Sequence, residues 1–432
     1  MEFTLEKTGV RQAMLVASAL VSALLTIQAG RIWLAWSWIH SQRPELMERG
    51  AALEPGNADA WDRLGRFRLW NFANPDPSLA VADFQRAVQN DPRTAEYWMD
   101  LASAYETTGD VSRARNALEH AKNVYPISAE VAWNYGNFLL RQQEYAEAFQ
   151  KIQQAVRTDP ALLPLAISRT WRSNEDVNQL LNQVLPPSPD AYFQALDFFQ
   201  SIHVVDPGLA VWQRVLTLGK PFALPRAFPF LEELIREDRA GDARRVWQQA
   251  LAASGAIRDE SADQSLISDG GFAHDFVNGG LGWRWNSRLG VAISFDSASL
   301  PGGNRSVRLD FSGGTNPDLD QPSQYVPVEP DHSYHFHGYL HTEGITTESG
   351  MRFSITDPHH AGAVNLETEN FTGSHSWTPV DVDLTTGPDT RFLIVRLFRP
   401  PSRLFENKLS GTAWIADLSL IPSGPKPGQT LQ

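Results

Sequence analysis

Three histidines in the C-terminal half have the spacing of a strand face. His335, His337 and His341 lie at alternate positions, so in an extended strand the side chains of His335 and His337 point to the same side. Paired imidazoles on one strand can bind a transition metal. No carboxylate stands at a recognisable ligand spacing, and we therefore predict a solvated strand face. The same prediction applies to His359-His360, which follow Asp357-Pro358 in an expected loop.

Two acidic pairs, Asp318/Asp320 and Glu367/Glu369, could supply the two carboxyl groups of a glycosidase. That chemistry needs the carboxyl groups on either side of one bond, and sequence spacing cannot show such an arrangement. Acidic residues in loops are usually solvated. The sequence has no nucleophile elbow, phosphate-binding loop, zinc-protease motif or dinucleotide fingerprint, and it has no cysteine. We expect a protein that is not an enzyme.

Aromatic residues in the same half could bind sugars, because sugar rings stack their apolar faces on aromatic rings. The available rings are those of Trp283, Trp285, Tyr325, Phe371 and Trp377. Most of them are expected in a hydrophobic core, since Trp and Phe bury well. We take Trp283, Trp285, Tyr325 and Trp377 as candidate glycan-binding residues.

The elements that position these residues begin with a helical repeat. Pro92, Pro126 and Pro160 stand 34 residues apart, and each ends the same apolar pattern. In residues 95–128, one face of a first helix carries Trp98, Leu101, Ala102 and Tyr105, and one face of a second carries Ala114, Leu118 and Ala121. Gly109-Asp110 is the expected turn between the two helices.

This pattern resembles the tetratricopeptide repeat family, and we expect three such repeats within residues 44–160. The repeat that ends at Pro160 departs in having its Trp one place late, at Trp133, and the first repeat has an insertion around 74–77. The resemblance implies a solenoid whose first helices line a concave surface for a protein partner. Asn134 and Asn137 are candidate partner-binding residues there. An ordinary helical bundle with chance spacing is the alternative.

Residues 161–258 keep a helical pattern, but the repeat decays. Pro186-Pro187-Ser188-Pro189 interrupts it, and Ala243, Trp247 and Ala250 are spaced like the second helix of a degenerate repeat. We expect irregular helix pairs that extend the solenoid and cap it. A separate helical domain is the alternative.

From residue 262 to 422 the sequence changes to short alternating runs between turn signals, which predicts an antiparallel β-sandwich. The runs are 306–311, 333–340, 351–356, 378–384, 392–398 and 413–420. Three motifs, at 269–272 with Gly282-Trp283, at 303–309 and at 411–420, resemble the galactose-binding-like jelly rolls that include carbohydrate-binding modules. A sandwich of another family is the alternative.

The jelly-roll resemblance also implies a structural calcium ion between the first and last strands, for which carboxylate and carbonyl oxygens are suitable ligands. Asp417 matches the acidic residue of the closing motif. Ala273 stands where a Glu usually follows the Phe of the opening motif, which puts the site in doubt.

The N-terminal residues 1–11 precede a membrane anchor and interfacial segment at 12–39. No residue from Gln12 to Gly30 is charged, a length close to the minimum for a bilayer span, and Trp33, Trp36 and Trp38 follow it. We expect an uncleaved anchor, with a cleaved signal peptide as the alternative. The basic residues on both sides leave the orientation undecided. Residues 423–432 are an expected disordered tail.

The net charge of −13 argues against nucleic-acid binding. The sequence therefore predicts a multidomain chain, α and then β: a transmembrane helix, an α-solenoid and a jelly roll. We expect an extracytoplasmic, membrane-anchored envelope protein that binds a protein partner and a glycan, accessory to surface polysaccharide assembly or export. A pure scaffold with a structural sandwich is the first alternative, and a glycan-active enzyme is the second.

Overall fold

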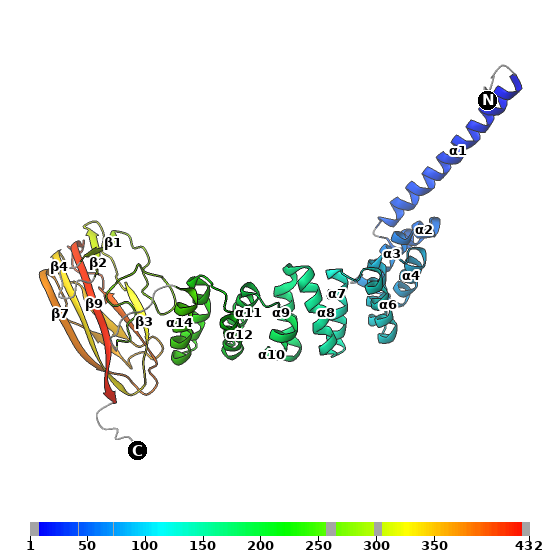
Figure 1. The fold of residues 1–432 in the computed structure, drawn as a ribbon. Helices are drawn as coiled ribbons and strands as arrows, with labels where there is room; N and C mark the ends of the chain where they lie inside the picture. The colour runs from blue at the N-terminus through cyan, green and yellow to red at the C-terminus, as the bar shows by residue number, and fades with distance from the viewer. Residues whose placement is uncertain (1–7, 42, 72, 256–264, 298–304, 426–432) are drawn as a thin grey trace. The chain divides into compact units, whose positions relative to one another are not determined.

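A computed structural model describes residues 8–41, 43–71, 73–255, 265–297 and 305–425. The chain divides into two compact units, Met1–Pro186 and Pro187–Gln432 (Figure 1). The division falls inside the predicted helical region 161–258, so the last helices belong with the β domain. The expected junction at 258–262, Gly303 and Asn304 of the second motif, and residues 1–7 and 426–432 lie outside the described residues.

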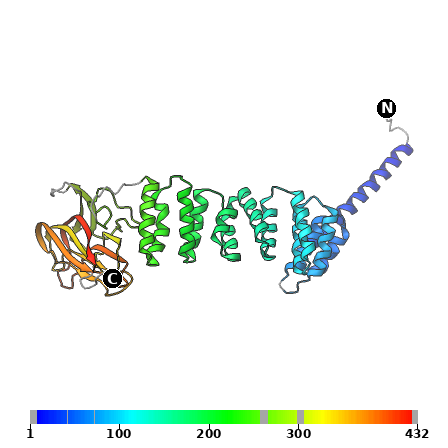
Figure 2. The same cartoon turned by 60° about the horizontal axis from the view of Figure 1, so that its bottom comes forward.

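The first unit consists of helices, and the predicted repeats are confirmed as helix pairs (Figure 2). Each helix expected to end before a proline of the 34-residue series does so. The elements are α1 (Thr8–Ile39), α2 (Pro44–Leu53), α3 (Ala58–Trp70), α4 (Pro77–Asn90), α5 (Ala95–Thr107), α6 (Val111–Val124), α7 (Ala129–Arg141), α8 (Tyr145–Thr158), a 3-10 turn (Pro160–Leu162), α9 (Leu163–Asn174), α10 (Val177–Gln179) and a π-helical turn (Leu180–Val184).

The turn between α5 and α6 forms as predicted. Gly109 adopts a positive φ of 81°, a conformation that glycine reaches without strain. The side chain of Asp110 then caps α6 by accepting a hydrogen bond from the backbone N–H of Arg113. Ala102, Ala114 and Ala121 are all buried where the two helices pack.

Glycines set how closely the paired helices approach. A Cβ atom on Gly65 of α3 would lie 2.8 Å from the Phe84 ring of α4, and one on Gly136 of α7 would lie 2.8 Å from Ile152 Cγ1 of α8. Neither contact has room for a methyl group. Gly50 of α2 repeats the arrangement against Ile39 of α1, again at 2.8 Å.

Helix α1 is therefore part of the repeat packing at its C-terminal end. Ala35 and Ile39 are buried, and Ile39 joins a small core with Met47 and Trp61. Gly9–Trp33 and Trp36 of α1 are exposed, and residues Gly9–Ile39 are long and apolar enough, by length and composition, to cross a membrane. The predicted interfacial segment thus also serves as a packing element, while Trp33 and Trp36 stay exposed.

The second unit begins with α11 (Pro189–Ser201), α12 (Val205–Thr217), a 3-10 turn (Leu224–Ala227), α13 (Phe228–Arg236) and α14 (Ala240–Ser254). Trp212 of α12 is fully buried and packs edge-on against Phe222. Gly208 lets the Phe230 ring approach the same helix, because a Cβ there would lie 2.6 Å from the ring. Ala243, Trp247 and Ala250 form the buried face of α14, as predicted.

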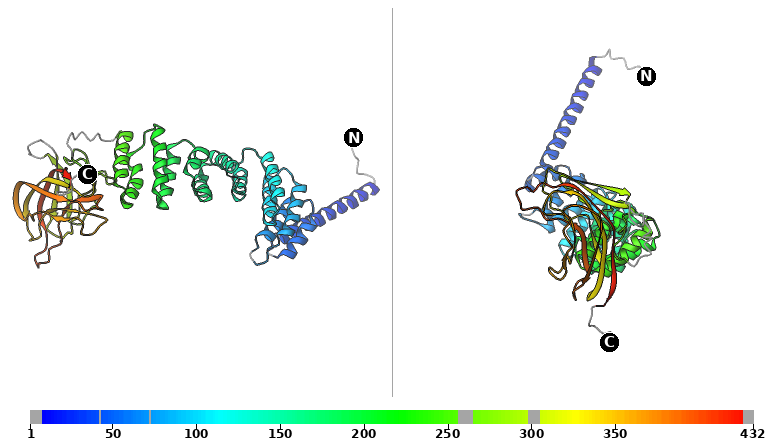
Figure 3. Two further views of the ribbon diagram at one scale, coloured as in Figure 1. Left: turned by 90° about the horizontal axis from the view of Figure 1, so that it is seen from below. Right: turned by 90° about the vertical axis from the view of Figure 1, so that its left-hand side faces the viewer.

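The rest of the second unit is two antiparallel sheets that share one hydrophobic core (Figure 3). One sheet has the order β1-β2-β9-β4-β7 and the other the order β3-β8-β5-β6. The strands are β1 (Val291–Ser297), β2 (Arg305–Ser312), β3 (Ser323–Pro327), β4 (His332–Ile345), β5 (Arg352–Thr356), β6 (Asn365–Glu367), β7 (Gly373–Thr385), β8 (Phe392–Phe398) and β9 (Ser410–Pro425).

All six predicted strand runs are found, and β1, β3 and β6 are additional. Strand β9 continues to Pro425, so the predicted tail begins at least three residues too early. Its last residues pair with the start of β4, as Gly424 opposes Ser333. A backbone that still makes sheet pairs is ordered to that point.

The sandwich docks on the last helices through a glycine-rich loop. A Cβ on Gly279 would lie 2.2 Å from the Phe228 ring of α13, and one on Gly280 would lie 2.8 Å from the Trp247 ring of α14. The Glu232 carboxylate of α13 accepts a hydrogen bond from the Gly280 backbone N–H, and both its oxygens pair with Arg284, at 3.0 and 2.8 Å. Bidentate pairing of this kind is strong and specific in orientation.

Replacing Gly136 by Ala tests the close approach of α7 and α8. The added methyl would also lie 3.2 Å from the Ala148 carbonyl oxygen, so one helix must shift. We expect a loss of about 1–3 kcal/mol in the free energy of unfolding of the first unit. Guanidinium denaturation followed by circular dichroism measures it. Gly56→Ala, where nothing lies within 4 Å, is the control and should change stability by less than about 0.5 kcal/mol. Equal stability of the two variants would contradict the packing argument.

Candidate binding surfaces

The first helices of the repeats carry neighbouring polar residues. Glu96 and Asp100 of α5 occupy the same places as Glu130 and Asn134 of α7, 34 residues on. In α3 the insertion at 74–77 shifts the pattern, and Asp62 and Arg66 adjoin the residues of α5 through the contacts of Arg66 rather than by repeat position. We call Asp62, Arg66, Glu96, Asp100, Glu130 and Asn134 the inner stripe.

Arg66 joins three carboxylates of the inner stripe. Its Nε lies 2.9 Å from Asp62 Oδ2 and 2.5 Å from Asp100 Oδ2, and its Nη2 pairs with Glu96. One guanidinium therefore faces three acidic groups, and Asp62 is only 3% exposed. Burial, together with the nearby Asp100 carboxyl, raises the pKa of Asp62 to about 8. Burial raises the pKa of Asp100 as well. With this raised pKa, we expect the buried Asp62 carboxyl to carry a proton at neutral pH.

The two predicted partner-binding asparagines differ in accessibility. Asn134 is exposed on the inner stripe, and its amide donates to the Glu130 carbonyl oxygen at 2.9 Å. Asn137 is 8% exposed, and its amide donates to the Trp133 carbonyl oxygen. The Asn137 side-chain oxygen is buried without a hydrogen-bond partner in the described residues. Asn134 is thus available for a partner, and Asn137 contributes mainly to packing.

The predicted sugar-stacking residues separate into core and surface. Trp283 is 3% exposed, its indole N–H donates to the Asp269 carbonyl oxygen, and its ring packs on Phe272. Trp283 therefore has no exposed face for a sugar, and its assignment as a glycan contact is wrong. Phe371 is also buried, and Trp285 packs against the same core. Tyr325 is half-buried on the outer face of the sheet that contains β3 and β8. Trp377 is half-buried on the outer face of the sheet that contains β4 and β7.

Tyr325 lines a polar pocket of about 300 Å³ on the outer face of β3 and β8. Ile394, its register partner, lies beside it, and Arg396, Asn286 and Gln321 supply polar groups around these two residues. The Arg284 guanidinium lies over the Tyr325 ring, 4.8 Å from its centre, and so links the pocket to Glu232 of α13. Sequence reasoning named Tyr325 but missed Arg396, because β8 is far away in sequence.

The outer face of the other sheet carries the histidines. His335 and His337 share a face, as predicted, and β7 brings carboxylates beside them that the sequence spacing did not reveal. Asp381 Oδ1 lies 2.7 Å from His337 Nδ1 and 3.2 Å from His335 Nε2, and Asp383 lies 2.8 Å from His335 Nδ1. The hydrogen bond with Asp383 raises the pKa of His335. This histidine is exposed, so the effect on stability is small.

Three rings and one guanidinium form a row that crosses the same sheet from β7 to β2. His341 lies 5.3 Å from the Trp377 ring and stacks at 4.5 Å on Trp414, and Arg308 lies over Trp414. The indole N–H of Trp414 donates to Asp296 on β1. Trp377 is thus part of a cross-strand row that fixes its orientation. Trp414 belongs to the closing motif in the sequence, and only the strand register shows that it joins this row.

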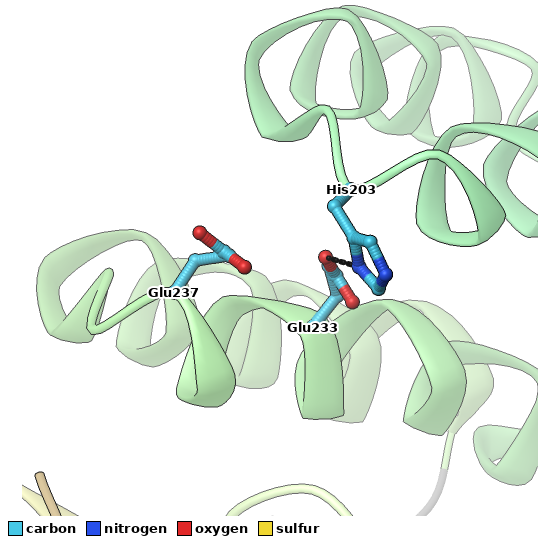
Figure 4. A group of neighbouring side chains, drawn as sticks. All are labelled: His203, Glu233 and Glu237. Atoms are coloured by element: carbon cyan, nitrogen blue, oxygen red, sulfur yellow. Dashed lines mark hydrogen bonds and ion pairs between the residues drawn. The ribbon is translucent and has the colours of Figure 1, made fainter.

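His203, Glu233 and Glu237 place one ligand atom each within 4.8 Å of one another, which could hold a metal ion (Figure 4). Glu233 is 1% exposed, and His203 Nδ1 lies 3.1 Å from its Oε1. Arg236, one turn along α13, also pairs with Glu233 and contacts His203 Nδ1. The guanidinium already supplies the positive charge that the buried carboxylate needs. Sequence reasoning missed this group, because His203 precedes Glu233 by 30 residues in the sequence.

The other predicted site residues have local roles. Asp417 lies half-buried on β9 with a positive φ of 54°, outside the metal-ligand cluster found in the described residues, so the calcium prediction stays untested. Asp357 accepts hydrogen bonds from the backbone of His359 and His360 and shapes their loop. Asp320 pairs with Arg288, and Glu367 pairs with Arg352.

Replacing Asp62 by Asn tests whether the buried Asp62 carboxyl holds a proton. The folded chain keeps this proton up to about pH 8, whereas an unfolded Asp releases it near pH 3.8. The contribution of this proton to the free energy of unfolding is therefore complete below the unfolded pKa of 3.8. It is lost as the pH rises toward the folded pKa of about 8, by at most about 1.4 kcal/mol per pH unit. Asn cannot titrate, and its amide can still donate to Asp100.

Guanidinium unfolding of the parent chain and Asp62→Asn at pH 5 and pH 8 measures this effect. We expect the drop in unfolding free energy between the two pH values to be smaller in the variant by about 2 kcal/mol. Asp59→Asn, whose side chain is 64% exposed, should leave the drop unchanged. The same drop in Asp62→Asn and the parent would show that Asp62 holds no proton.

Comparison with known proteins identifies the repeats. The model described as "Tetratricopeptide repeat" matches residues 72–121 and 109–162, so this part of the chain consists of tetratricopeptide repeats, the class of module that binds proteins. The chain is similar to the solved structure titled "Crystal structure of MamA" at 15% identity and a TM-score of 0.27, covering 40% of this chain and 85% of that one. It is also similar to "MamA MSR-1 C2" at 20% identity and a TM-score of 0.24, covering 27% and 66%. No curated protein matches the sequence.

Proposed function

We propose that the protein is a membrane-anchored scaffold without enzymatic activity whose tetratricopeptide repeats bind a protein partner along the inner stripe. The observation that carries this proposal is the series of helix pairs in which polar residues of α3 contact those of α5 and equivalent polar residues follow on α7. Tetratricopeptide repeats bury their apolar residues between helices, which leaves the polar inner positions for recognition.

The charges of the inner stripe favour a basic partner segment. The stripe has four carboxyl groups, on Asp62, Glu96, Asp100 and Glu130, and one guanidinium, on Arg66. Arg66 is already held by three of them. Even with Asp62 protonated the inner stripe stays negative, so lysine or arginine side chains of a partner would be attracted to it.

Helix α1 is the proposed membrane anchor, because its exposed apolar length suffices for a bilayer. We further propose that the remainder of the chain lies outside the cytoplasm, in the cell envelope. This orientation is supported by the character of the sandwich, which resembles extracellular carbohydrate-binding domains, and by the lack of cysteine in the sequence.

A second candidate function, glycan binding by the sandwich, is favoured by the polar pocket beside Tyr325. The two antiparallel sheets are compatible with the proposed jelly roll, and such a module would suit an accessory role in surface polysaccharide assembly or export. A structural calcium ion near Asp417 belongs to the same proposal. The docking of the sandwich on α13 and α14 favours instead a structural role for this domain.

Reporter fusions after residue 45 and at the C-terminus test the anchor. We use one reporter that is active only outside the inner membrane and one that is active only inside. Activity of the outside reporter at both positions is the expected result, because α1 alone would cross the bilayer. Activity of the inside reporter at the C-terminus would contradict the envelope location and leave a cytoplasmic-face scaffold.

Binding of charged model peptides tests the inner stripe. A ten-residue peptide of alternating Lys and Ala should bind the full chain in nanodiscs, measured by fluorescence anisotropy, and its Glu counterpart should not. We expect the double variant Glu96→Gln/Glu130→Gln to weaken binding about fivefold or more, because it removes two charges of the stripe. Glu45→Gln/Glu54→Gln makes the same change of net charge on and beside α2 and should have little effect. Equal loss in both double variants would show that only net charge matters.

A further inference from the structure

The polar pocket beside Tyr325 has an excess of positive charge. Two of its charged groups are already neutralised, since Arg284 pairs with Glu232 and Asp320 pairs with Arg288. Arg396 has no ion pair in the described part of the chain. In the described residues its Nε donates to Ser354 Oγ at 3.4 Å and its guanidinium lies over the Phe398 ring, 5.3 Å from the ring centre, so its two terminal nitrogens can still donate to a ligand.

The uncharged polar groups of the pocket can donate hydrogen bonds. The Gln321 side-chain oxygen accepts from the backbone N–H of Asn286, which leaves the Gln321 NH₂ group available. The Asn286 amide and the Tyr325 hydroxyl can each donate as well as accept. Together with the charge of Arg396, these groups would suit a ligand that has hydrogen-bond acceptors and a negative charge.

The base of the pocket is apolar and fixed. Tyr325 and Ile394 are register partners on neighbouring strands, and their side chains lie on the same outer face. Arg284 covers one side of the Tyr325 ring and is itself held by the two oxygens of Glu232. The helical part of the second unit thus preorganises the pocket.

We infer that this pocket binds an acidic sugar, a hexuronate unit of a glycan. A hexuronate has an apolar ring face for Tyr325 and Ile394, hydroxyls for the amide groups, and a planar carboxylate that the free end of Arg396 can bind through two parallel hydrogen bonds. This inference rests on the proposed glycan-binding function of the sandwich and names the class of glycan.

Isothermal titration of the full chain in lipid nanodiscs tests the inference, because sugar-based detergents are then absent. The probes are tetragalacturonate, its methyl ester and the neutral tetrasaccharide maltotetraose. Tetragalacturonate should bind at least tenfold more tightly than its methyl ester, which keeps the shape but loses the charge. Arg396→Met should weaken tetragalacturonate binding at least tenfold, and Arg396→Lys should weaken it less.

Arg352→Met is the matched control, because Arg352 lies on the adjacent strand but is already paired with Glu367 at 3.0 Å. It should bind tetragalacturonate like the parent. Thermal unfolding of each variant verifies that the sandwich stays folded, and Tyr325→Ala provides a second test from the base of the pocket.

The outcomes separate the inference from the function on which it rests. Equal affinity for the acid and the ester, or binding that is unchanged in Arg396→Met and Tyr325→Ala, would overturn the acidic-sugar assignment while leaving glycan binding in place. Binding of none of the three probes would overturn the assignment and count against the glycan-binding function. The scaffold role of the repeats would be unaffected.

Discussion

The close approach of paired helices is the constraint on which the repeat architecture depends. Gly50, Gly65 and Gly136 sit where two helices touch, and each lacks room for a Cβ atom. This approach fixes the distance between helices in each pair and so keeps successive pairs in the same relation. The equivalence of Glu96 and Asp100 with Glu130 and Asn134 in the inner stripe follows from that regularity.

A second set of contacts makes the β domain part of a larger body. Glu232 holds both the glycine-rich loop and Arg284, and Arg244 of α14 donates to the Pro327 carbonyl oxygen. Ion pairs and backbone hydrogen bonds with fixed geometry restrict rotation as well as separation. Helices α13 and α14 therefore form a base for the sandwich.

The sequence was sufficient for features that depend on local spacing. The 34-residue prolines located the helix ends, and alternation located six strands, because both signals lie within one element. The binding surfaces depend on register. Arg396 joins Tyr325 on one outer face, and Asp381 faces His337, only after strands distant in sequence have paired. Trp283 was a candidate glycan contact because composition cannot tell which aromatic rings enter the core, and the burial of its side chain excludes it.

The packing of Ile39 against Gly50 means that α1 and the first repeats share one helix pair rather than a flexible linker. If α1 spans a bilayer as proposed, the repeats cannot sample the volume around a tether. Their inner stripe would keep a fixed relation to α1, and its direction would follow the tilt and rotation of that single helix. A partner held in the same membrane would then be met by lateral diffusion and in a restricted orientation.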